Sequence, residues 1–432
     1  MSVRAALTAA GRRLPLGDPR AAQLGGTIFS SFVGQLALLV SGVLSARLLG
    51  PEGRGHVALF IIVALITVQV TSLGVPTAVT YELGRRGTSA TDMMRRLLGL
   101  LVTQFAATAA IHGGVIALIV SGSPGEVKTA GWVSVAVGCP MLLQAYGQGL
   151  LLGAKRYRAF NITRLLPSVG FAVGVAVVVF LSDGDIVEVI VGWVAATWLA
   201  AGVTLVAALR AARGGARNSP PSRVRDLVRF GLRGLLGSAS PVETFQMDQA
   251  VVGLFLSPVA LGLYSVAVAL TNLPRFLGQS VATFAYAETA AMPSPRGRRA
   301  IWRFTAVGAV LSLAVVLVIE LFAESLVSLF FGDAFRDSVS IVRILLVGSL
   351  FLAVRRVLAE GARGLGEPML STRAEVVSWL ALLPLLALLA PTLGADGVAI
   401  AMALSSGISL IVLAALLRGD LGQAATRFGK TD

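Results

Sequence analysis

Residues 241–287 read PVETFQMDQAVVGLFLSPVALGLYSVAVALTNLPRFLGQSVATFAYA and decide the fold. Two apolar runs, each long enough to cross a lipid bilayer, meet there at the tight turn Ser257-Pro258. The runs nevertheless hold Glu243, Asp248 and Arg275 at or near membrane depth. A charge at that depth costs roughly 2.5–3.5 kcal/mol, so it normally faces a partner or a water-filled cavity. The stretch therefore predicts a polar path through a helical membrane protein.

The composition extends this prediction to the whole chain. Of the 432 residues, 56% are hydrophobic and 13% are charged, whereas a soluble domain carries about 25% charged residues. The net charge of +14 is concentrated in short arginine clusters between apolar runs, a pattern that reflects membrane topology rather than nucleic-acid binding. The single cysteine, Cys139, excludes an intrachain disulfide, and a total of two histidines makes a histidine-based metal site unfavourable.

Hydropathy along the sequence predicts an all-α polytopic membrane protein with about twelve transmembrane helices. The expected spans lie near 24–49, 55–81, 97–120, 128–152, 159–181, 187–209, 229–256, 259–287, 303–331, 339–359, 370–393 and 396–417.

The loops between these spans alternate in charge. One set is rich in arginine, including the Arg85/Arg86 cluster and the Arg355/Arg356/Arg363/Arg373 group, whereas the other set holds few basic residues, among them Arg54, Lys128 and Arg336. By the positive-inside rule, the arginine-rich loops and both termini are expected in the cytoplasm of a cell-membrane protein.

A Gly- and Pro-rich basic segment divides the chain into two sets of six spans. The expected units are a cytoplasmic segment 1–23, a bundle 24–209, a basic linker 210–228, a second bundle 229–417 and a tail 418–432. A shift of 207 residues pairs Leu49, Pro51 and Gly55 with Leu256, Pro258 and Gly262. Repeated six-span units of this kind are typical of transporters, with the substrate site between the halves.

Arg275 is the first candidate for binding an anionic substrate. It lies about 24 Å from the outer turn at 1.5 Å per residue, and a guanidinium group matches phosphate oxygens in a bidentate geometry. The alternative is that its charge reaches the inner membrane interface, as long basic side chains do. The complete set of expected cavity residues is Arg275, Arg233, Arg164, Arg47, Gln35, Asn272 and Gln279.

Two acidic residues are candidates for ion coupling. Asp248 and, with weaker support, Glu320 lie within predicted spans, where each would carry a coupling ion or form a structural ion pair. Proline residues, among them Pro241 and Pro274, are expected to kink their helices. No nucleotide-binding or hydrolase motif is present in the sequence. We therefore expect no enzyme activity and no cofactor, with H+ or Na+ as the candidate coupling ion.

Three stretches resemble the polysaccharide (Wzx-type) flippases of the multidrug/oligosaccharidyl-lipid/polysaccharide exporter superfamily. The first is Ala46-Arg-Leu-Leu-Gly-Pro-Glu-Gly-Arg-Gly with Leu73-Gly-Val-Pro-Thr, the second runs from Met247 to Ala267, and the third is Leu365–Pro368. The resemblance implies two six-helix bundles forming a V around a central cavity. It departs from lipid II flippases, which carry arginines along the first helix where this chain has Gln35 and Ser41.

The resemblance implies a flippase or exporter of undecaprenyl-diphosphate-linked oligosaccharide that works by alternating access. Its expected partners are the lipid-linked oligosaccharide, membrane lipids and glycan polymerase or glycosyltransferase machinery, and no nucleic acid. The alternative is a cation-coupled exporter of small organic cations, which a cavity dominated by Asp and Glu would favour. A membrane-embedded glycan polymerase is a third class, but the outer loops are too short for the active site that it requires.

Overall fold

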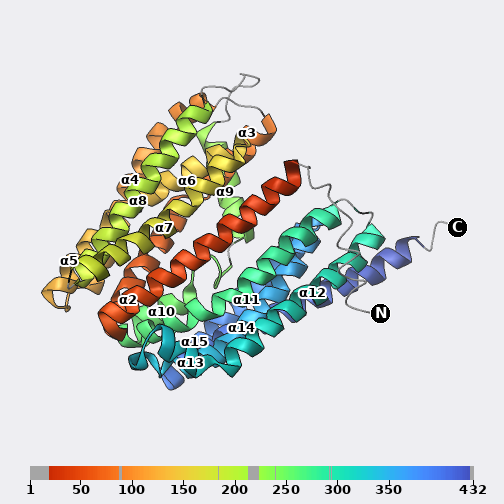
Figure 1. Ribbon diagram of the computed structural model, residues 1–432. Helices are drawn as coiled ribbons and strands as arrows, with labels where there is room; N and C mark the ends of the chain where they lie inside the picture. Colours follow the sequence, from red (N-terminus) through yellow and green to blue (C-terminus); the bar gives the residue numbers. More distant parts are fainter. Residues whose placement is uncertain are drawn as a thin grey trace.

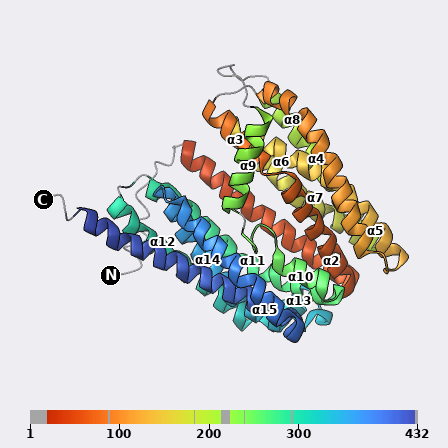
Figure 2. The same ribbon diagram turned by 180° about the vertical axis from the view of Figure 1, so that it is seen from behind.

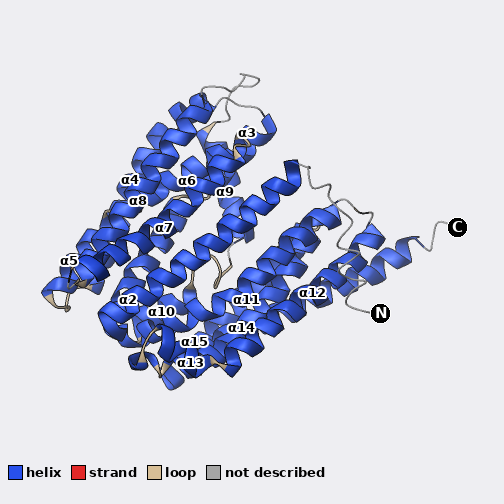
Figure 3. Ribbon diagram, in the orientation of Figure 1, coloured by secondary structure: helices blue, strands red, loops and turns tan. Residues whose placement is uncertain are grey.

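The computed structural model describes residues 19–86, 90–182, 184–212, 223–238, 240–290, 292 and 294–428. The described part is helical and contains no strand (Figure 3). The all-α prediction is confirmed. Residues 1–18 of the expected N-terminal segment, 213–222 of the linker and 429–432 of the tail lie outside the described residues.

The first half of the chain forms helices that mostly alternate in direction. They are α2 (Pro19–Thr71), α3 (Val75–Arg86), α4 (Ala90–Ile119), α5 (Gly125–Val135), α6 (Gly138–Gly153), α7 (Tyr157–Leu181) and α8 (Ile186–Ala212). Two of the predicted spans are joined in α2, where Gly50 has φ 64° and Pro51 follows. A positive φ suits glycine because it has no Cβ, so the expected Pro turn is made by these two residues.

The second half repeats this arrangement with more interruptions. Its elements are α9 (Val224–Ser238), α10 (Met247–Phe255), α11 (Pro258–Ala290), α12 (Ser294–Leu321), α13 (Ala323–Phe330), the 3₁₀ helix η1 (Asp333–Phe335), α14 (Ser338–Gly364) and α15 (Pro368–Phe428). Gly394, with φ 59°, divides α15 in the way that Gly50 divides α2. The longest helices of both halves are therefore pairs of spans joined at a glycine.

Eight helices among the described residues are long and apolar enough to cross a membrane. Two of them, Phe29–Thr71 and Pro368–Arg418, contain the glycine bends and are long enough for two crossings each. The broken pair α9 and α10 and the arginine-containing α14 fall outside this set. The chain is thus a multi-pass membrane protein, and the count of twelve spans stays a prediction.

The helices form two bundles that are inclined to each other (Figures 1 and 2). The first contains α3 to α8, and the second contains α11 to α15. The start of α2 runs between them and packs on both α7 and α11. We call the end of the molecule where α2 starts and α15 ends the basic end, because the arginine-rich connections lie there. The opposite end, with the bends at Gly50 and Ser257-Pro258, is the turn end.

The seventh span departs from the sequence prediction. The sequence predicts one span over 229–256, but the structure has two short helices separated by the non-helical residues 240–246. Pro241 lacks a backbone N–H donor, and Gln246 adopts a left-handed conformation with φ 48°. The half-helix α9 packs mainly on α3 of the first bundle, whereas α10 packs on α11 and α15 of the second.

Candidate functional site: the interface between the two bundles

A single hydrophobic core joins the two bundles at the turn end. It contains Phe60 and Val63 of α2 together with Leu261 and Tyr264 of α11. Toward the basic end the cores are separate: one is built from α2, α3, α4, α6 and α8 with Leu227 of α9, and two others come from the second half alone. The interior packing is therefore shared at the turn end and independent at the basic end.

Two glycines allow the two turns to touch at the shared end. A Cβ atom on Gly55 would overlap the carbonyl oxygen of Pro258, and one on Gly262 would overlap the carbonyl oxygen of Pro51. These are the residues that the 207-residue repeat pairs with each other, and they meet reciprocally. Small residues let helix backbones approach closely in membranes, so the two halves are in direct backbone contact at the turn end.

Arg47 forms a second connection at the turn end. Its Nε donates to the carbonyl oxygen of Phe330 at 2.8 Å, and its Nη2 donates to the carbonyl oxygen of Leu329. These carbonyls end α13 of the second bundle, and a basic side chain there satisfies free carbonyl groups. Arg47 thus links α2 to α13 at the turn end and makes these contacts outside the pocket described next.

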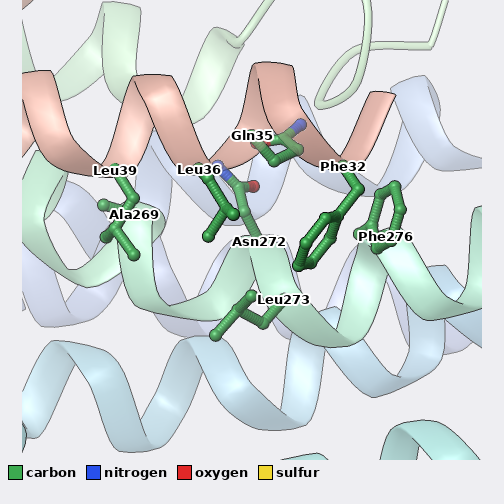
Figure 4. A pocket seen from close by; sticks show the side chains of 8 residues that line it. All are labelled: Phe32, Gln35, Leu36, Leu39, Ala269, Asn272, Leu273 and Phe276. Carbon is green, nitrogen blue, oxygen red and sulfur yellow. The ribbon is translucent and has the colours of Figure 1, made fainter. Parts of the chain in front are cut away.

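A pocket lies between α2 and α11 on the side toward the basic end (Figure 4). Gln35 of α2 and Asn272 of α11 supply its polar side chains. Phe32 and Phe276 lie beside each other with ring centroids 5.7 Å apart. The remaining lining residues are Leu36, Leu39, Ala269 and Leu273. The structure therefore brings together two predicted cavity residues, Gln35 and Asn272, from the two halves of the chain.

Arg275 follows Asn272 by three residues on α11. Its side chain is half-buried, and its Nε and Nη2 atoms are buried without a hydrogen-bond partner among the described residues. It lies close enough to Glu243 and Asp248 to interact with both electrostatically, but no ion pair with either is present in the described part of the chain. Buried guanidinium nitrogens without a hydrogen-bond partner are costly, so Arg275 has unused capacity for an anion.

Asp248 lies in the first turn of α10 and is buried. The hydroxyl of Tyr264 donates to its Oδ2 at 3.0 Å, whereas its Oδ1 has no partner among the described residues. Burial next to Arg275 and Tyr264 is compatible with either of the predicted roles, a coupling site or half of an ion pair.

The second bundle contains a charged network that the sequence does not predict. Arg355 is 3% exposed, and its Nη2 lies 2.8 Å from Oε2 of Glu243 while its Nη1 contacts Oε1 of Glu375. Arg356 adds contacts to Glu243 at 3.5 Å and to Glu360 at 3.6 Å. The sequence predicts the end of this span at residue 359 and counts both arginines with the arginine-rich connection that follows. In the structure α14 continues to Gly364, and the carboxylates compensate the two arginines within the helix.

The other predicted site residues lie apart from the pocket. Arg164 on α7, Arg233 on α9 and Gln279 on α11 are exposed, and Gln279 follows Arg275 by one helical turn. Glu320 pairs with Arg343 at 3.2 Å, and Arg343 also contacts Glu324 at 3.4 Å. Within the described ranges, no group of acidic, histidine or cysteine side chains has the arrangement of a metal site.

The fold and this interface define a multi-pass membrane protein made of two helical bundles. Residues 24–287, more than half of the chain, match the family model described as "Polysaccharide biosynthesis protein", and the chain belongs to that family. The chain is also similar to the probable low-salt glycan biosynthesis flippase Agl15 of Haloferax volcanii, at 25% identity over 193 residues. That match covers 44% of this chain and 41% of the relative, so the chain spans less than half of the relative's length.

Solved structures of the multidrug/oligosaccharidyl-lipid/polysaccharide (MOP) exporter superfamily share the fold. An inward-facing multidrug resistance MATE family transporter has a TM-score of 0.71 at 20% identity, with 91% of this chain and 96% of that chain covered. The lipid II flippase MurJ, in an inward closed conformation, has a TM-score of 0.72 at 12% identity, with 91% and 87% covered. A MOP superfamily transporter from Pyrococcus furiosus, described as having a binding pocket of reverse polarity, has a TM-score of 0.64 at 19% identity, with 94% and 96% covered. At these identities the likeness concerns the fold alone.

Proposed function

We propose that this protein moves an undecaprenyl-diphosphate-linked oligosaccharide from the inner to the outer leaflet of the cell membrane, for the synthesis of surface polysaccharide. The family description and the flippase name of the Haloferax relative support a role in moving a glycan, and the undecaprenyl-diphosphate carrier is part of the proposal. The observation that carries the proposal is Arg275, a half-buried arginine whose Nε and Nη2 are buried without a hydrogen-bond partner among the described residues, next in sequence to the pocket residue Phe276.

The path begins at the basic end. Because arginine-rich connections face the cytoplasm in helical membrane proteins, the basic end and both termini are cytoplasmic in this proposal. The bundles are joined by a shared core only at the opposite end, so a head group loaded from the cytoplasm approaches Arg275 without breaking that core. Alternating access then requires the Gly55–Pro258 and Gly262–Pro51 contacts to open while the cytoplasmic side closes.

Charge-assisted hydrogen bonds favour a diphosphate at Arg275. The guanidinium group presents parallel donors that match phosphate oxygens, and the contacts are strengthened by the low dielectric of the site. Coupling to H+ or Na+ through Asp248 is part of the proposal, as is cooperation with glycan polymerase or glycosyltransferase machinery. The protein acts as a transporter and not as an enzyme.

Export of small organic cations is the second candidate function. The observation that favours it is the shared fold with MATE multidrug transporters. The Pyrococcus transporter is described as having a binding pocket whose reverse polarity suggests a different function. In this chain, an arginine next to the pocket that makes no ion pair with a described residue disfavours a cationic ligand. We therefore rank this function second.

Reconstitution separates the two functions. The purified full chain is placed in proteoliposomes that contain either a fluorescent undecaprenyl-diphosphate-linked oligosaccharide or a fluorescent organic cation. We expect protein-dependent transfer of the lipid-linked label between leaflets, read by quenching with an impermeant reagent, and no protein-dependent movement of the cation. Transport of the cation with no transfer of the lipid-linked label contradicts the proposal.

A further inference from the structure

Arg54, like Arg275, has a buried side-chain nitrogen without a hydrogen-bond partner among the described residues. Among the described residues, five arginines have buried side-chain nitrogens without a hydrogen-bond partner. Three of them, Arg298, Arg355 and Arg356, are held by carboxylates. Arg54 and Arg275 make no ion pair with a described residue. The sequence analysis placed Arg54 in a loop, but the structure places its half-buried side chain within α2.

The position of Arg54 is at the turn end of the bundle interface. Its neighbour Gly55 touches Pro258 of the second bundle. Its Nη2 reaches back along α2, where a Cβ atom on Gly42 would lie 3.6 Å away from it. Gly42 follows the pocket residue Gln35 by seven residues, or two helical turns, so the two residues share a face about 10 Å apart. The guanidinium of Arg54 is thus aligned with the pocket along the helix axis.

The turn itself does not require an arginine at this position. The 207-residue repeat pairs Arg54 with Leu261, which is fully buried in the shared core. Leucine therefore fills the equivalent place in the second half of the chain. Arg54 is partly desolvated and makes no ion pair with a described carboxylate, and leucine stands at the equivalent position of the second half. A role of Arg54 in stability is therefore not evident.

We infer that Arg54 forms a second oxyanion-binding position, on the turn-end side of the pocket, that receives a phosphate or carboxylate group of the translocated molecule. This inference rests on the proposed function for the identity of that molecule. Arg275 then binds an anionic group on the basic side of the pocket, and Arg54 binds on the turn-end side. Two anion-binding positions, one after the other along the path, could serve a diphosphate that passes from the first to the second. They could equally bind a diphosphate and an acidic sugar of the same molecule.

Binding of small anions to the purified full chain tests the position without measuring transport. Inorganic pyrophosphate and glucuronate are titrated by calorimetry against the protein in lipid nanodiscs. Loss of a charge-assisted contact weakens binding about tenfold, so Arg54→Gln is expected to bind at least one probe about tenfold more weakly. Loss of pyrophosphate affinity identifies the phosphate source, and loss of glucuronate affinity identifies an acidic sugar.

Arg336→Gln is the matched control. It removes one positive charge at the turn end, but Arg336 is exposed and pairs with Asp333 three residues earlier. We expect it to bind both probes as the wild type does. Arg54→Lys keeps the positive charge but loses the bidentate donor geometry of the guanidinium group, so it is expected to bind with intermediate affinity. This variant decides the question if Arg54→Gln yields no folded protein.

Thermal unfolding distinguishes binding from a structural role. Arg54→Gln removes a partly buried charge that has no carboxylate partner, so its melting temperature is expected to equal or exceed that of the wild type. Wild-type affinity for both probes in Arg54→Gln, or in Arg54→Lys if that is the only folded variant, overturns the inference. If the lipid-linked label does not move in proteoliposomes, the proposed function is wrong. The binding measurement on Arg54 does not depend on that outcome.

Discussion

Gly55 lies directly against the carbonyl oxygen of Pro258, with no room for a side chain between them. Gly262 lies against the carbonyl oxygen of Pro51 in the same way, and these are the equivalent residues of the 207-residue repeat. The turns that join the first two spans of each half are therefore each other's packing partners. In a carrier that works by alternating access, they form the contact that must break when the turn end opens.

Gly55→Ala is expected to open the turn end. The added methyl group meets backbone atoms that are fixed by the Pro258 turn, and overpacking of this kind costs about 1–3 kcal/mol. The closed conformation should lose roughly 5- to 150-fold in population relative to the open one. The measurement is the labelling rate of Leu39→Cys in the pocket by an impermeant thiol reagent added on the turn-end side, in a Cys139→Ala background.

Gly202→Ala serves as the control for this prediction, because a Cβ atom on Gly202 would meet no heavy atom within 4 Å outside its own helix. It should leave the labelling rate of Leu39→Cys unchanged. An equal rate in Gly55→Ala and the wild type would show that the turn contact does not hold the turn end closed.

Arg355→Met is expected to destabilise the second bundle strongly. Removal of the guanidinium leaves Glu243 and Glu375 without their shared partner, and breaking a buried pair in this way costs about 3–5 kcal/mol. The melting temperature in detergent should fall clearly, and the triple variant with Glu243→Gln and Glu375→Gln should recover most of the loss. Arg336→Gln breaks an exposed pair and should cost at most about 1 kcal/mol. A wild-type melting temperature for Arg355→Met would contradict this account of the network.

Helix content, the membrane class and the two glycine or proline turns were predictable from the sequence, because apolar length and turn residues are local signals. The break between α9 and α10 was only partly predictable. Pro241 predicts a kink. The docking of α9 on α3, however, depends on the close approach of Gly231 to Leu73, where a Cβ atom on Gly231 would lie 2.6 Å from the Leu73 carbonyl oxygen. Sequence periodicity contains no information about such a contact between halves.

The candidate site was predictable where a charge had no local explanation. Arg275 and Asp248 stand out because they interrupt long apolar runs. Arg54 and Arg355 do not stand out in this way. Arg54 falls between two predicted spans, and Arg355 lies near the end of the predicted span 339–359, beside other arginines. Glu360 and Glu375 were the available signal for Arg355, since acidic residues at matching depth predict pairing within a bundle. For Arg54, only the folded structure brings the side chain toward Gly42.

The pair Asp248 and Arg275 distinguishes ion coupling from charge compensation. Asp248→Asn is expected to impair transport, because it removes a buried carboxylate that accepts from Tyr264 and acts on Arg275. Partial rescue by Arg275→Gln in the double variant indicates an ion pair that forms during the cycle. Loss of the pH dependence of transport with no rescue indicates a proton carrier. Wild-type transport in the single variant removes Asp248 from the mechanism.

Thiol labelling tests the orientation of the chain in the membrane. In a Cys139→Ala background, Ser123→Cys and Asp396→Cys lie at the turn end, and Ser294→Cys lies at the basic end. The first two should react with an impermeant reagent from outside intact cells, whereas Ser294→Cys should react only after the membrane is opened. Labelling in the reverse order would place the arginine-rich connections outside and overturn the expected entry side.

Arg275 provides the most direct test of the proposed substrate class. Its two buried donors have no hydrogen-bond partner in the described protein, so the variant Arg275→Ala breaks no hydrogen bond of the described protein. Each charge-assisted hydrogen bond to a phosphate oxygen is worth roughly 1.5–3 kcal/mol, so transfer of the lipid-linked label should fall about tenfold or more. Arg275→Lys retains the charge but loses the bidentate donor geometry of the guanidinium group, and should recover transport only in part.

Phe276→Leu, a neighbouring apolar change on the same helix, controls for a general disturbance of α11. Normal transport by a stably inserted Arg275→Ala would mean that Arg275 does not contact the diphosphate and that another group must recognise the anion.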